Sequence, residues 1–74
     1  MGKSELERLV LETIEEDVGA RPCVSEIQIQ DDGQGEWGCS AYFGSGAIKR
    51  LIRFSGLTHD DAVIVRNVML RWVN

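Results

Sequence analysis

The apolar positions along the chain change period twice, from helical spacing to strict alternation and back to helical spacing. Ser4 followed by Glu7 is a capping-box pattern, and Gly19 ahead of Pro22 is a typical helix end. The apolar residues between these signals recur at helical spacing: Leu6, Leu9, Val10, Ile14 and Val18. The pattern predicts a helix over residues 5–18 whose outward side is acidic.

The next segment, residues 23–30, alternates with period two, which is typical of a strand buried on one face. The side chains expected to face the interior are Cys23, Ser25, Ile27 and Ile29. The residues at 31–35, Asp-Asp-Gly-Gln-Gly, form a turn sequence before a second strand that begins at Trp37. Pairing Ile29 with Trp37 would make one apolar face continuous across the strands.

A third strand is predicted over residues 47–55, after a hairpin loop at residues 44–47. The expected register pairs Phe43 with Ile48, Ala41 with Arg50, Cys39 with Ile52 and Trp37 with Phe54. The same segment also has helix-like spacing and a possible terminator at Gly56, so a helix is the alternative. Alternation that continues to Phe54 favours the strand, although Arg50 interrupts the apolar face and would have to reach toward an edge.

Thr58 followed by Asp61 repeats the helix-start signature, and a second helix is predicted over residues 59–73. Its broad apolar side comprises Ala62, Val65, Val68, Met69, Trp72 and Val73. Three further apolar residues fall outside that side: Val63, Ile64 and Leu70. They predict either a helix held from both flanks by the sheet and the first helix, or a self-association surface.

These elements predict one small α+β domain over residues 1–74, in the order α-β-β-β-α. Both helices are expected on one face of a three-stranded antiparallel meander. The element order resembles that of double-stranded-RNA-binding domains. Those domains have a basic start to the last helix and a Gly-Pro-x-His loop, whereas the matching segments here, residues 59–62 and 31–35, are acidic. The resemblance is therefore one of topology and implies no function.

The charge is uneven between the two halves of the 74-residue chain, whose net charge is −4. Residues 1–37 hold ten acidic and three basic residues, whereas residues 38–74 hold two acidic and five basic ones. The acidic half argues against general nucleic-acid affinity. No apolar run approaches a membrane span, and acids interrupt the first apolar segment, so we expect a cytoplasmic protein with no membrane contact.

The residues that could carry chemistry have simpler structural interpretations. Cys23 and Cys39 would lie about 13 Å apart in the expected register, too far for a disulfide, and are interpreted as small core residues in a reducing compartment. His59 precedes Asp60 and Asp61, but acids in the first helical turn complement the helix dipole without any ligand. We therefore expect no catalytic residue, metal or cofactor, and a protein that is not an enzyme.

The outward face of the sheet is the surface with the most distinctive composition. The residues expected there are Val24, Glu26, Gln28, Gln30, Gly38, Ser40, Tyr42, Lys49, Leu51 and Arg53. Apolar Tyr42 and Leu51 among polar neighbours predict a protein-interaction or self-association module, with a protein partner or a homodimer. The alternative is a weak single-stranded nucleic-acid binder that uses Tyr42, Lys49 and Arg53, although Glu26 on the same face would oppose a polyanion.

Overall fold

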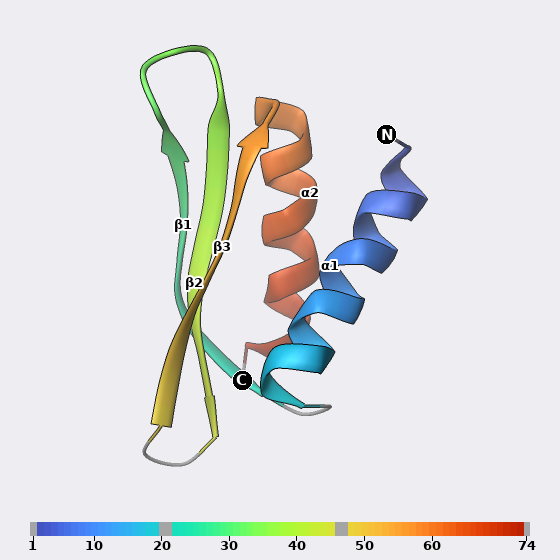
Figure 1. Ribbon diagram of the computed structural model, residues 1–74, viewed down its shortest axis with the longest axis vertical. Helices are drawn as coiled ribbons and strands as arrows, with labels where there is room; N and C mark the ends of the chain where they lie inside the picture. Colours follow the sequence, from blue (N-terminus) through green and yellow to red (C-terminus); the bar gives the residue numbers. More distant parts are fainter. Residues whose placement is uncertain (1, 20–21, 46–47, 74) are drawn as a thin grey trace.

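The predicted element order is confirmed by a computed structural model, which describes residues 2–19, 22–45 and 48–73 (Figure 1). The elements are α1 (Lys3–Val18), β1 (Cys23–Asp31), β2 (Trp37–Ser45), β3 (Ile48–Leu57), α2 (His59–Met69) and the 3₁₀ turn η1 (Leu70–Trp72). The three strands form an antiparallel sheet in the order β1-β2-β3. The described chain is thus an α+β fold of the predicted type.

Both helices lie on the same side of the sheet (Figure 1). Helix α2 contacts all three strands, whereas α1 contacts mainly α2 and, less extensively, β2. The buried apolar side chains come from every layer: Leu6, Val10, Ile14, Val24, Cys39, Ala41, Phe43, Ile52, Ala62, Val65, Val68 and Met69. The core therefore fills one face of the sheet and leaves the other face open.

Helix α1 begins two residues earlier than predicted, and Gly2 is its N-cap. Ser4 consequently lies inside the first turn and makes no capping hydrogen bond, so the capping-box prediction is wrong. The predicted end is confirmed, since Gly19 adopts φ 91° and its N–H donates to Glu15 O. A positive φ is easily reached only by glycine, which explains the residue at this position. Leu9, included in the apolar pattern, is exposed.

Residues 48–57 form a strand, which excludes the helical alternative. The register differs by two residues from the predicted one, since Phe43 pairs with Arg50 and Ser45 with Ile48. Gly44 therefore belongs to β2 and not to the hairpin loop, whose residues 46 and 47 lie outside the described part. A shift of two preserves which face each side chain occupies, so Ile52 is still buried.

Arg50 lies on the helix side of the sheet, as its alternation requires, and is exposed at an edge. Its Nη1 donates to the backbone carbonyl of Asp17, at a distance of 3.3 Å, in the last turn of α1. A cation at a helix C-terminus is favourable because the last carbonyl groups carry partial negative charge. Arg50, which interrupts the apolar face, thus links β3 to α1.

Strand β1 contains a bulge that the sequence pattern did not reveal. The register with β2 shifts between Ser25 and Gln28, and Glu26 within the shift adopts φ 55°. The extra residue reverses the alternation, so Val24 is buried and Cys23 is exposed. The predictions of a buried Cys23 and an outward Val24 are therefore wrong, whereas Cys39 is buried as predicted.

A second irregularity lies where β2 begins. The displacement of two residues would bring Trp37 opposite Gly56 in place of the predicted Phe54. A further shift, where Gly56 adopts φ 70°, makes Leu57 its partner. Phe54 and Leu57 still pack against the core. Two edge-to-face ring contacts join β2 to the helical segment formed by α2 and η1. Trp37 contacts His59, and Phe43 contacts Trp72.

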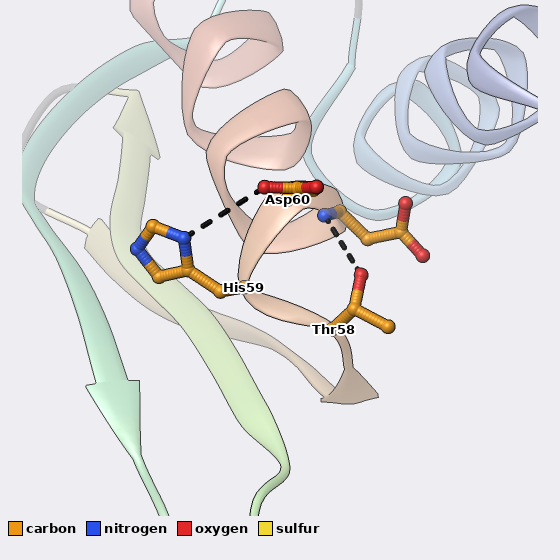
Figure 2. Close-up of polar contacts among 4 residues, drawn as sticks. Thr58, His59 and Asp60 are labelled. Carbon is orange, nitrogen blue, oxygen red and sulfur yellow. Dashed lines mark hydrogen bonds and ion pairs between the residues drawn. The ribbon is translucent and has the colours of Figure 1, made fainter.

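Helix α2 starts as predicted, since Thr58 is the N-cap and its Oγ1 accepts a hydrogen bond from the N–H of Asp61 at 3.1 Å (Figure 2). The predicted helix over residues 59–73 is too long. It ends at Met69 and tightens into η1, and Val73, assigned to the apolar side, is exposed.

Candidate functional site on the open face of the sheet

The open face of the sheet, here called the outer face, carries an exposed aromatic and an exposed aliphatic side chain side by side. Tyr42 of β2 and Leu51 of β3 are direct cross-strand partners. Their relative exposures are 38% and 54%. Directly opposed side chains in an antiparallel pair stand about 5 Å apart, so the two form one continuous apolar contact area. The sequence predicted both residues, and the structure brings them together.

A hollow next to this pair lies over Ser40 of β2, and Gly38 lies beyond its lining. Both small residues are buried although they lie on the open face of the sheet. A Cβ built on Gly38 would lie 3.0 Å from Phe54 O and 4.0 Å from Arg53 Nε, so the Arg53 side chain lies close to this glycine. The hollow has a volume of about 310 Å³, and its lining combines residues of all three strands: Glu26, Gln28, Gln30, Ser40, Tyr42, Leu51 and Arg53.

The charge of the outer face changes sign from one edge strand to the other. Glu26 lies on β1, whereas Lys49 and Arg53 lie on β3, and all three are exposed. None of their side chains makes a hydrogen bond or ion pair with the described part of the chain. The outer face therefore has an acidic edge on β1, Tyr42 on the central strand, and a basic edge on β3 where Leu51 lies between Lys49 and Arg53.

The bulge in β1 gives the acidic edge its charge. It adds a residue to β1 at Glu26 and brings that side chain to the hollow, in the interval between the Ser25–Tyr42 and Gln28–Ser40 pairs. Sequence reasoning assigned Glu26 to this face by simple alternation and missed the bulge. The bulge is seen as a register shift and as a non-glycine residue at positive φ, and both are visible only in the folded backbone.

The other predicted binding residues lie at different places. Lys49 lies on the outer face, beside Tyr42, in a second hollow of about 280 Å³. Of the predicted self-association residues, Leu70 is 48% exposed, Val63 is half-buried and Ile64 packs against the core. Because α2 covers the opposite side of the sheet, these three do not join the outer face.

The His59 cluster has a structural role. Nδ1 of His59 lies 4.0 Å from the carboxylate of Asp60, which is fully exposed (Figure 2). The imidazole ring packs edge to face on Trp37, with ring centroids 4.7 Å apart. Among residues 2–19, 22–45 and 48–73, no group of three or more His, Cys, Asp or Glu side chains is arranged to hold a metal ion.

Cys39 is poorly suited to nucleophilic chemistry. Burial raises the pKa of its thiol to about 11, although the nearby Arg66 guanidinium acts in the opposite direction. A thiol with this pKa is protonated near pH 7 and is a weak nucleophile. Its Sγ lies 3.7 Å from Met69 Sδ, a contact between the sheet and α2.

Comparisons place no known activity on this surface. No helix in the described part of the chain is long and apolar enough to span a bilayer. Comparison of the chain with protein-family models, with curated proteins and with solved structures finds no match.

Proposed function

We propose that the chain is a small, non-enzymatic protein-interaction or self-association module whose contact surface is the outer face of the sheet. The observation that carries this proposal is the exposed cross-strand pair of Tyr42 and Leu51. Burying both side chains in an interface would remove apolar area from water. This stabilises the complex by about 25 cal/mol per Å² of apolar area buried. We also propose the cytoplasm as its location, since Cys23 and Cys39 lie on different rows of the sheet and suit a reducing compartment.

The composition of the outer face supports a protein partner. Tyrosine and arginine are the side chains that interfaces favour near their centres, and polar groups typically surround them. Here Tyr42 and Leu51 lie one row from Arg53 of β3 and Gln28 of β1, and all four line one hollow. This arrangement of an apolar centre with a polar rim is what a small binding patch requires.

Single-stranded nucleic acid is the competing proposal, supported by Tyr42 beside Lys49 in the second hollow. A base could stack on the tyrosine ring while the cations contact the backbone. Tyr42 is, however, the one aromatic side chain described on this face, and Glu26 would repel a polyanion. The protein partner therefore accounts for more of the surface.

Site-specific photo-crosslinking tests this proposal even when the identity of the partner is not known. A photoreactive phenylalanine analogue replaces Tyr42 in one variant and Leu9 in the control, because Leu9 is also exposed but lies on α1. We expect illumination in producing cells to give a discrete protein adduct from position 42 that is absent from position 9. Mass spectrometry of the adduct identifies it as protein or nucleic acid.

Two outcomes would contradict the proposal. One is the absence of any adduct specific to position 42. The other is a nucleic-acid adduct at that position, which Lys49→Ala would weaken and which would establish the competing function.

A further inference from the structure

We infer that the occupant of the outer face is a second copy of this chain, stacked face to face about a two-fold axis that runs parallel to the strands above β2. This inference deepens the proposed function and rests on it. It follows from the way in which charge and apolar side chains are distributed over the three strands.

The charged and apolar side chains of the outer face fall on two adjacent rows of the sheet. Gln28 of β1 pairs with Ser40 of β2, which pairs with Arg53 of β3, and Glu26 lies in the bulge next to this row. The adjacent row places Tyr42 on the central strand and Leu51 on β3. The acidic side chain and the basic side chain thus lie at nearly the same level along the strands, on opposite sides of the centre.

A two-fold axis parallel to the strands brings the two charged edges of the outer face together. A two-fold axis parallel to the strands keeps each level and exchanges left for right, so β1 of one copy faces β3 of the other. Arg53 then faces Gln28 of the partner copy and lies within one row of the partner copy's Glu26. Each contact occurs twice, and Tyr42, on the central strand, lies close to its own counterpart.

A two-fold axis in the interface but perpendicular to the strands would place β1 against β1 and β3 against β3. The Lys49 and Arg53 edge would then meet its own copy, and like charges facing each other across an interface cost several kcal/mol. Of these two axes, the one parallel to the strands makes the outer face complementary to itself.

The size of the face sets the strength of the dimer. Three strands about 4.8 Å apart, each nine or ten residues long, cover about 400 Å² per copy. A stable specific interface usually covers about 800 Å² per partner. We therefore expect a reversible dimer that dissociates at micromolar concentrations and weakens with added salt.

Sedimentation equilibrium of the full chain, from about 10 µM to about 1 mM at low salt, tests the inference. The variants are Glu26→Lys, Arg53→Glu and the combined charge exchange. Glu12→Lys is the control for Glu26→Lys, because it makes the same change in net charge but lies on α1. Circular dichroism of each variant verifies folding, which these exposed substitutions should leave intact.

We expect the unmodified chain to dimerise and each single reversal to weaken the dimer by more than about tenfold. The combined exchange should restore the dissociation constant to within about threefold of the original, and Glu12→Lys should change it by less than that. Tyr42→Ser, which removes the central ring, should also weaken the dimer.

A chain that is monomeric over the whole range overturns the inference. So does a dimer that both single reversals leave unchanged, or one that the combined exchange fails to restore. A monomeric chain that still gives a specific adduct with another protein from position 42 retains the proposed function and refutes only the second copy. A dimer without any adduct from position 42 refutes both.

Discussion

At the scale of single residues, Glu26 is the position where local preference and tertiary structure disagree most. Its φ of 55° is costly for a residue with a Cβ, yet it lies in the middle of an edge strand. The conformation turns Val24 toward the core and brings Glu26 to the hollow on the outer face. One strained residue thus serves both packing and the proposed contact surface.

We expect Glu26→Gly to leave the free energy of unfolding unchanged or to raise it by up to about 1 kcal/mol. Glycine relieves the backbone strain of the folded state. The stability gained in this way equals or exceeds the stability lost through the greater entropy of the unfolded chain. Gln28→Gly is the matched control, because position 28 is exposed on the same strand but has ordinary extended geometry. It should cost about 1 kcal/mol. Urea unfolding measures both, and equal losses would show that Glu26 is not strained.

At the scale of elements, two similar helix-start signatures have different outcomes. Thr58 caps α2 through its hydroxyl, whereas Ser4 lies within α1. A capping side chain acts only at the residue that precedes the first helical turn. Where that residue lies depends on how far the helix extends, and in α1 the helix extends back to Lys3. The motif therefore predicted the presence of both helices correctly, but it predicted the first residue of α2 alone.

Thr58→Ala should lower the free energy of unfolding by about 1 kcal/mol, because the N–H of Asp61 loses its acceptor. Ser4→Ala should lower it by less than about 0.3 kcal/mol, since alanine favours the helix interior and no capping bond is lost. Thermal or urea unfolding of the two variants in parallel measures the difference. An equal cost for both would mean that Ser4 also caps its helix.

The strands, like the helices, are present as predicted, but their pairing differs from the prediction. Alternation through Phe54 correctly favoured β3 over a helix, but the β2–β3 register and the part of the β1–β2 register after the bulge are displaced by two residues from the prediction. A displacement of two leaves every side chain on its own face, so the burial pattern alone does not detect it. The pairing of Tyr42 with Leu51 follows from the observed register and not from the predicted one.

At the scale of the whole molecule, the layers meet around Cys39, which is 1% exposed. Its thiol contacts Met69 and thereby joins the central strand to α2. Burial raises the pKa of this thiol from the ordinary value of 9.0 to about 11. The unfolded chain therefore loses this proton at a lower pH than the folded chain, which links global stability to pH.

Between about pH 9 and pH 11, unfolding releases the Cys39 proton, so the stability from this group is complete below pH 9 and is lost as the pH rises. The full loss amounts to about 2–3 kcal/mol. Comparison of the free energy of unfolding at about pH 8 and about pH 10.5, for the original chain and Cys39→Ala, isolates this contribution. We expect the variant to have the weaker pH dependence. Equal pH dependence would contradict the assigned pKa.

The sequence by itself determined the number, type and order of the elements, because the apolar period and the turn residues are local properties. It also determined that Tyr42 and Leu51 face away from the core, since alternation on β2 and β3 is continuous there. Only the tertiary structure decided the strand registers, the bulge at Glu26 and the burial of Val24 in place of Cys23. These depend on how α2 and the sheet fill their shared volume, a property of the packed core that no local pattern contains.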